Sequence, residues 1–222
     1  MKQINNMQSL SLQKIVPIQV TILLSCVLLL GLFSQPSIAS HDKVYEITIL
    51  HTNDFHARFR PISKYDNNCS QKNNAKGKCF GGTARLISAV EDARSRHSNT
   101  ILLDGGDQFQ GTLFYNLYKG KVAAEMMNKL GYDGMTVGNH EFDDGPDTLR
   151  AFMDAVNFPV LLANANVDLE PELKGKLHKS TTLLKNNRKI GLIGVVTEDV
   201  VDLSSPGDNI TITDSVASVQ SE

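Results

Sequence analysis

The sequence has little net charge, and nothing in it repeats. Its 222 residues include 22 basic and 24 acidic side chains, which are mixed along the chain. Such a balance predicts no broad basic face for nucleic acid or anionic lipid, so we expect no nucleic-acid partner. No internal repeat or low-complexity tract is present, and 41% of the residues are hydrophobic. This ordinary composition predicts a globular chain with one sizeable core.

Acidic side chains are absent from the first forty residues. This stretch contains a 14-residue apolar run, 20–33, and then Ser37-Ile38-Ala39, whose small residues suit a signal peptidase. The run is shorter than the roughly 20 apolar residues that a transmembrane helix needs. The pattern therefore predicts a signal peptide over residues 1–39 and a mature domain over 40–222, secreted or held at the cell surface.

Cysteine is scarce as well. Of the three cysteines, Cys26 lies in the predicted signal peptide, so the mature chain keeps Cys69 and Cys79. Two cysteines in an oxidising compartment are expected to pair, and a disulfide would restrict the polar loop that contains them. A zinc site is the alternative, but such sites usually have closer Cys spacing and further ligands.

Apolar periodicity after the signal region alternates between strands and helices. The expected strands are 44–50, 100–103, 134–137 and 159–163, and the expected helices are 84–97, 122–130 and 149–156. The first strand is apolar on both faces, so we expect it in the interior of a sheet. Strand, helix, strand is the order of parallel crossover units, which makes the fold class α/β.

Two features follow these units. Residues 183–184 and 190–196 flank a polar turn and predict a hairpin. A helix capped at Asp214 or Ser215 begins shortly before the sequence stops at Glu222.

Three of the predicted strands end in polar residues that can bind metal. Asp54 and His56 follow the first strand, Asp107 follows the second, and Asn139 and His140 follow the third. Neighbouring parallel strands share one crevice at their carboxyl ends, so these side chains are expected to converge. Carboxylate, amide and imidazole groups suit zinc, manganese or related divalent ions. Each cluster alone is typical of a surface turn, but together they predict a metal centre.

The chemistry of a two-metal centre suggests a role for each residue. Two divalent ions about 3.5–4 Å apart need an anionic bridge, for which Asp107 is the natural choice, and they polarise phosphoryl oxygens and activate water. His140 is adjacent to a ligand and Asp143 can hold its ring, so we predict a catalytic dyad. Nearby glycines are expected to leave room for a phosphate: Gly105, Gly106, Gly111 and Gly138.

Other residues close to these motifs are given structural or solvent roles. We expect His51 to pack beneath the site, and Arg58 and Arg60 to be solvated, although they could approach an anionic substrate. The aromatic residues after Asp107 are expected to pack in the core or in loops rather than stack on a base: Phe109, Phe114, Tyr115 and Tyr118. The remaining histidines are expected in solvent: His41, His97 and His178.

The motifs together resemble those of the animal ecto-5′-nucleotidase and salivary apyrase family, which belongs to the calcineurin-like metallophosphoesterases. The resemblance is carried by HTNDFH, GGTARL, LDGGDQFQGT, YKG and TVGNHEFDDG, and it extends from about residue 44 to about residue 214. It implies a four-layer α/β/β/α sandwich, followed by a C-terminal domain that binds the nucleoside. Where such proteins dimerise, the resemblance implies that the C-terminal domain forms the contact.

The resemblance also implies roles for individual residues. Asp54 and His56 would bind the first metal, Asp107 would bridge, and Asn139 would bind the second. His140 with Asp143 would stabilise the transition state, and Cys69 and Cys79 match a disulfide of the animal enzymes. Family members take further ligands from two later Gly-His segments, whereas His178 is the only histidine after His140 here. We therefore expect an incomplete metallophosphoesterase domain without the nucleotide-binding domain.

These features predict an enzyme that hydrolyses extracellular nucleoside 5′-monophosphates, such as AMP, to nucleoside and phosphate with two divalent ions, zinc or manganese. One alternative keeps the chemistry and changes the substrate to nucleoside di- or triphosphates, as in apyrases, or to other nucleotides. The other alternative is a non-catalytic secreted fragment, because the later ligands are missing. Membrane anchoring is not readable, since a lipid-anchor signal lies at a C-terminus.

Overall fold

The computed structural model describes residues 44–222, of which Tyr45–Glu222 form one compact unit. The predicted signal peptide over residues 1–39 and His41 lie outside the described residues. None of the helices in the described part is long and apolar enough to cross a membrane.

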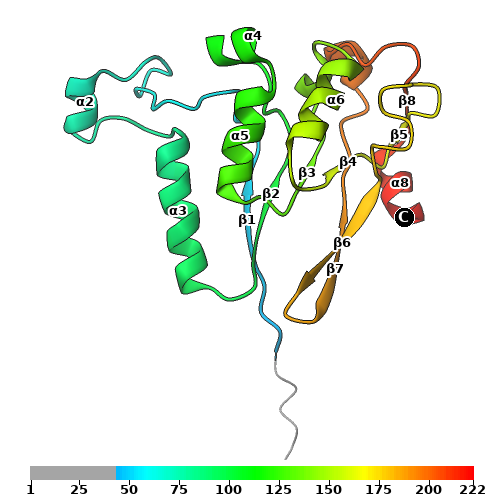
Figure 1. Cartoon of the computed structure of the whole chain (residues 1–222), viewed down its shortest axis with the longest axis horizontal. Coiled ribbons are helices and arrows are strands. Elements are labelled where there is room, and N and C mark those ends of the chain that lie inside the picture. The colour runs from blue at the N-terminus through cyan, green and yellow to red at the C-terminus, as the bar shows by residue number, and fades with distance from the viewer. Residues whose placement is uncertain (1–43) are drawn as a thin grey trace, which may run out of the picture. The chain divides into compact units, whose positions relative to one another are not determined.

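A parallel sheet of four strands organises this unit (Figure 1). Its strands are β1 (Thr48–Thr52), β2 (Thr100–Asp104), β3 (Gly134–Thr136) and β4 (Val160–Leu161), and they pair in this order. The strands alternate with the helices α3 (Thr83–Arg96), α5 (Lys121–Leu130) and α6 (Pro146–Ala155). The predicted α/β class and its three main helices are therefore confirmed, with strand ends that differ by a few residues.

The three helices cover one face of the sheet. Because the strand order follows the chain, right-handed crossovers place every helix on the same side. Val90 of α3, Met127 of α5 and Phe152 of α6 pack there in one buried cluster with Leu102 and Met135 of the sheet. The predicted end of α5 is also confirmed, since Gly131 adopts a left-handed φ of 69° and returns its N–H to Met127 and Asn128.

A hairpin lies against the other face. Its strands β6 (Ser180–Lys185) and β7 (Arg188–Ile193) are antiparallel, and the turn at Asn186 and Asn187 has φ values of 45° and 63°. Thr136 of β3 donates a hydrogen bond to the Val195 carbonyl at 2.9 Å. The described residues thus supply a helix layer, the parallel sheet and a hairpin beneath it.

The rest of the chain forms short elements. Strand β5 (Ala165–Asn166) pairs with β8 (Thr211–Ile212), and α8 (Ser215–Ser221) begins at the predicted cap Asp214, whose carboxylate accepts from the Ala217 N–H. Four short helical elements were not predicted: α2 (Gln71–Ala75), α4 (Leu113–Tyr118), η1 (His140–Phe142) and α7 (Val200–Leu203).

The cysteine loop, residues 69–79, contains α2 and lies beyond the N-terminus of α3 (Figure 1). Cys69 and Cys79 form the predicted disulfide, with their Cα atoms 5.8 Å apart, and enclose α2. The loop has almost no core of its own, since only Cys79 among residues 69–79 is buried.

The prediction of an interior first strand is wrong. Strand β1 begins at Thr48 rather than Val44, lies at the edge of the sheet, and leaves Ile49 56% exposed. His51 points to the same side as Ile49 and is also exposed, so the prediction that it packs beneath the site is wrong too. The reason is that, among the described residues, β6 and β7 cover only part of this face.

Candidate metal centre

The loops that follow β1 and β2 run side by side at the carboxyl edge of the sheet. The N–H groups of Asp54 and His56 donate to the carbonyls of Gly106 and Asp107, both at 3.0 Å. The next residue, Ala57, donates to the carbonyl of Gln108 at 3.1 Å. Segments some fifty residues apart in sequence are thereby held in register, which is the convergence that the strand-end motifs predicted.

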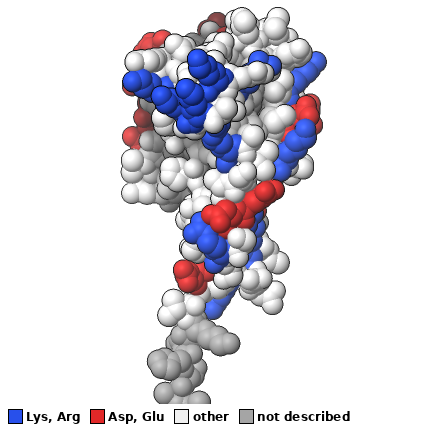
Figure 2. Space-filling view, turned by 90° about the vertical axis from the view of Figure 1, so that its left-hand side faces the viewer, with Lys and Arg blue, Asp and Glu red and all other residues white. Residues whose placement is uncertain are grey.

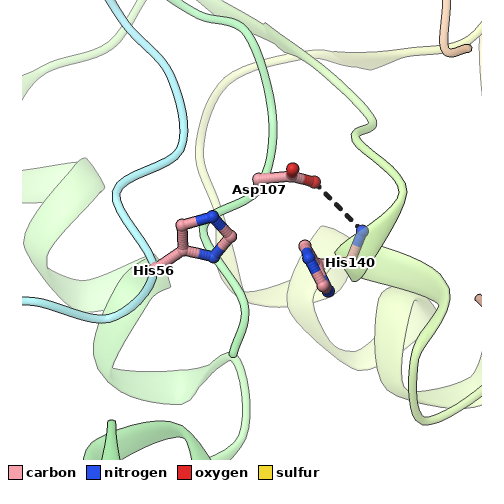
Figure 3. A group of neighbouring side chains, drawn as sticks. All are labelled: His56, Asp107 and His140. Carbon is pink, nitrogen blue, oxygen red and sulfur yellow. Dashed lines mark hydrogen bonds between the residues drawn. The ribbon is translucent and has the colours of Figure 1, made fainter. Parts of the chain in front are cut away.

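Three candidate side chains meet at this edge (Figure 3). His56, Asp107 and His140 each offer one donor atom, and these atoms all lie within 4.8 Å of one another. All three residues are half-buried, and Asp54 Oδ1 lies 3.8 Å from His56 Nε2. This donor set of imidazole and carboxylate fits a zinc- or manganese-type ion.

The orientation of the His56 ring leaves its Nε2 atom free to bind a metal ion. Its Nδ1 lies 3.1 Å from the carbonyl oxygen of Phe109. Because a carbonyl can only accept, Nδ1 carries the proton and Nε2 keeps its lone pair. Nε2 is also the nitrogen nearer to Asp54, so the backbone has already selected the tautomer that can bind a metal.

The backbone is strained at the candidate ligands. Asp54, His56 and Asp107 have φ values of 52°, 49° and 59°, and Ala57, which follows His56, has 50°. A left-handed conformation costs a residue with a side chain about 1–2 kcal/mol, and it persists only where the surroundings fix it. Here the paired backbone hydrogen bonds of the two loops fix it, and the strain aims the side chains at one point.

The glycines allow backbone segments to approach each other. A Cβ atom at Gly106 would collide with the backbone of Gly138, one at Gly111 with the backbone of His56, and one at Gly138 with Asp107 Oδ1. The space beside these three glycines is therefore filled by protein, and the prediction that they leave room for a phosphate is wrong for them. Their small size instead brings the ligand-bearing loops together.

Glu141 joins the β2 and β3 loops, a role that sequence analysis missed. This carboxylate is completely buried and accepts four backbone hydrogen bonds. Oε2 accepts from Asp107 at 2.9 Å and Gly138 at 2.7 Å, and Oε1 accepts from Gln108 at 2.8 Å and Phe109 at 3.3 Å. Burial raises the pKa of Glu141 to about 7, while the donors from Asp107 and Gly138 oppose that shift. In the sequence, only the position of this acidic residue directly after His140 pointed to a role for Glu141 at the site.

A second buried carboxylate supports the β2 loop. Asp104 accepts from the Gly106 N–H at 2.9 Å, from Gln108 Nε2 at 2.8 Å and from Thr52 Oγ1 at 2.5 Å. Burial raises its pKa to about 6, although these hydrogen bonds lower it. Thr52 also lies 2.6 Å from the hydroxyl of Tyr132. This network fixes the turn from β2 to Asp107.

The predicted dyad has the expected geometry. His140 Nδ1 lies 2.7 Å from Asp143 Oδ2, and Ser204 donates to the other oxygen of Asp143 at 2.7 Å. Burial lowers the pKa of His140, but the hydrogen bond and charge of Asp143, together with the charges of Asp107 and Glu141, outweigh it. The net pKa of His140 therefore lies above its ordinary value, which favours an imidazolium.

The His140 backbone is part of the same contact set. Its N–H donates to Asp107 Oδ1 at 3.0 Å (Figure 3). Because Asp143 engages Nδ1, Nε2 is the ring nitrogen left to face the centre. Asn139 immediately precedes His140, is half-buried, and starts η1 with its carbonyl accepting from Phe142 at 3.1 Å.

The residues given structural roles have mixed outcomes. Phe109 and Tyr115 are buried in the core and Phe114 packs against it, as predicted, whereas Tyr118 is 51% exposed. His97 and His178 are exposed, as predicted. Arg58 is not simply solvated, because it donates to Asp66 at 2.9 Å, and the Arg60 guanidinium lies over the Phe114 ring at 5.8 Å.

Comparison with known proteins agrees with this geometry. The model of the calcineurin-like phosphoesterase family matches residues 47–208. An apyrase of Tabanus yao is 41% identical over 178 residues, which cover 80% of this chain and 31% of the relative. A 5′-nucleotidase of Diplobatis ommata is 42% identical over 185 residues, covering 80% of this chain and 30% of the relative.

A solved structure shows the same arrangement of elements. The 5′-nucleotidase precursor of Thermus thermophilus superposes with a TM-score of 0.70 at 34% identity, over 79% of this chain and 33% of that protein. The chain thus spans about a third of the length of the relatives it matches.

Proposed function

Because this chain belongs to the calcineurin-like phosphoesterase family, we propose that it forms the metal-binding part of a 5′-nucleotidase-type phosphohydrolase. The proposed reaction splits an extracellular nucleoside 5′-monophosphate into nucleoside and phosphate. The observation that carries the proposal is the meeting of His56, Asp107 and His140 within 4.8 Å, with Asp143 at 2.7 Å from His140. The 5′-nucleotidases among the relatives support the reaction class.

The proposed centre holds two divalent ions. Asp54 and His56 would bind the first, Asp107 would bridge, and Asn139 would bind the second. When bound, such ions supply Lewis acidity toward phosphoryl oxygens and activate water near neutral pH. Asp107 has one oxygen engaged by the His140 N–H, which fixes the direction of its remaining lone pairs. The geometry suits zinc or manganese.

His140 is the proposed catalytic residue. Its pKa is raised, chiefly by the hydrogen bond and charge of Asp143, which favours a ring that can donate a proton or a hydrogen bond from Nε2 to an anionic phosphoryl group. Asp143 holds the ring through Nδ1 and is itself held by Ser204. Both contacts restrict rotation of the imidazole, so that Nε2 points in one direction.

The substrate assignment has a direct competitor. An apyrase is among the relatives at 41% identity, which favours nucleoside di- and triphosphates. A non-catalytic, metal-binding role is the competitor from a different class. An extracellular location is proposed for all three, and the Cys69–Cys79 disulfide supports it because such bonds persist in oxidising compartments.

Phosphate release separates these candidates. The protein, loaded with zinc or manganese, is incubated with AMP, ADP and ATP, with and without a chelator. Chelator-sensitive release from AMP that falls strongly in His140→Ala supports the proposal, and release from ADP and ATP but not from AMP supports an apyrase. Metal binding without release from any of the three supports the non-catalytic, metal-binding role for this chain.

A further inference from the structure

Although the total charge is close to neutral, one segment of the chain has a strong excess of basic residues. Between Phe55 and Val90 the chain carries seven basic residues and one acidic residue, whereas the rest of the described chain carries twelve basic and twenty-two acidic residues. The basic residues are Arg58, Arg60, Lys64, Lys72, Lys76, Lys78 and Arg85, and the acidic one is Asp66. Basic and acidic residues are therefore mixed along most of the chain but not along this segment.

The cysteine loop, residues 69–79, is the most one-sided part of the segment. It contains Lys72, Lys76 and Lys78, all exposed, and no acidic residue occurs between Asn67 and Val90. Of the seven basic residues, Arg58 is the only one in the described chain with a carboxylate within 4.0 Å, that of Asp66. The three lysines of the loop thus present their charge to solvent without an acidic neighbour.

The loop has a fixed shape. Its ends are joined by the disulfide, Ser70 caps α2 by accepting from the Asn73 N–H at 3.2 Å, and Lys76 ends the helix. Arg85 of α3 donates to the Asn74 side chain at 2.7 Å, which ties the loop to the body of the protein. Lys72 and Lys76 are four residues apart, a spacing at which like charges in a helix repel. The fold therefore holds these like charges close together.

Figure 2 looks at the side of the molecule on which α2 and α3 lie, and it shows a group of Lys and Arg side chains at the upper end of this face. A group of this kind, held in place and unpaired, attracts polyanions through its summed field. Its attraction should weaken as salt screens the charges.

We infer that the cysteine loop is a docking surface for a sulfated polysaccharide. The disulfide supports the extracellular location proposed above, a setting in which sulfated glycans are the abundant linear polyanions. The loop has no aromatic residue on which a base could stack, which disfavours single-stranded nucleic acid. It also lacks the large apolar residues by which amphipathic segments enter a membrane, since Ala75 is its only aliphatic residue.

Heparin binding tests this inference with the full chain. The variant Lys72→Gln/Lys76→Gln/Lys78→Gln removes three charges from the loop, and Lys174→Gln/Lys176→Gln/Lys179→Gln removes three charges from another exposed, closely spaced group. The first variant should bind heparin at least about tenfold more weakly than the parent, and the second should match the parent. Equal loss in both variants, or no loss in the first, overturns the inference.

Two further experiments test which class of polyanion binds and whether the disulfide-closed loop is needed for binding. A 20-nucleotide single-stranded DNA and phosphatidylserine vesicles replace heparin at the same salt concentration, and tighter loop-dependent binding to either overturns the polysaccharide assignment. The variant Cys69→Ser/Cys79→Ser keeps every charge but opens the loop. It should bind heparin several-fold more weakly while its far-UV circular dichroism is retained, and unchanged affinity contradicts a preformed surface.

Discussion

The backbone N–H of Asp107 donates a 2.9 Å hydrogen bond to the buried carboxylate of Glu141. Asp107 follows β2 and Glu141 follows β3, so this contact and its three companions hold two ligand-bearing loops at a fixed separation. Because the donor is the backbone N–H of Asp107, a change of the Asp107 side chain keeps this contact, whereas a change of the Glu141 side chain removes it. Glu141, which is not itself a proposed ligand, thus fixes the positions of the loops that contain the proposed ligands.

Glu141→Gln should destabilise the protein strongly. Both carboxylate oxygens accept two N–H groups each, so an amide must place its own NH₂ group against two donors whichever way it is turned. The cost of such buried, unsatisfied donors is about 2–4 kcal/mol in the free energy of unfolding. Urea denaturation measures it.

The same substitution at a solvent-exposed position provides the control for that experiment. Glu125 forms an exposed i,i+4 pair with Lys129, and Glu125→Gln should change the free energy of unfolding by less than about 0.5 kcal/mol. If both variants unfold at the same urea concentration, the proposed role of Glu141 is wrong.

Gly138→Ala should weaken metal binding. A Cβ at this position would collide with Asp107 Oδ1 and lie 2.9 Å from Glu141 Oε2, so the methyl group must push the proposed bridging ligand aside. Gly191→Ala is the matched control, because a Cβ there meets nothing within 4 Å. Titration calorimetry with zinc or manganese should show lower affinity for the first variant alone, and equal affinities would disprove the steric argument.

Much of this site could be predicted because the ligands follow strands in a regular order. Apolar periodicity located the helices α3, α5 and α6, and parallel crossovers then required His56, Asp107 and His140 to meet at one edge. The pairing of His140 with Asp143 was predictable as well, since three residues of separation in a tight turn bring side chains together.

The remainder depends on tertiary contacts that no local pattern encodes. Periodicity cannot show that Glu141 turns inward to four N–H groups, nor that Asp54 and Asp107 adopt left-handed backbone. The apolar sequence of β1 predicted burial on both faces of the strand. The exposure of Ile49 depends instead on how far the hairpin of β6 and β7 extends across the sheet. Short helices such as α4 were missed because fewer than two turns give too little periodicity.

The Cys69–Cys79 disulfide should stabilise the protein by about 2–3 kcal/mol through its effect on the unfolded chain. The bond closes a loop with a sequence separation of 10, in a segment with little core of its own. Thermal denaturation of Cys69→Ser/Cys79→Ser against the parent measures the effect. Free thiols at both positions in unreduced, secreted protein, detected by mass spectrometry, would show instead that the bond does not form.

Metal titration of Asp107→Ala tests the central claim most directly. Asp107 is the proposed bridge and lies among the donor atoms that meet within 4.8 Å, whereas the exposed Asp168 lies outside that group and serves as the control. Titration calorimetry with zinc or manganese should show that the parent and Asp168→Ala bind equally, and that Asp107→Ala binds more than about tenfold more weakly. Equal binding by Asp107→Ala and the parent would contradict the proposed metal centre.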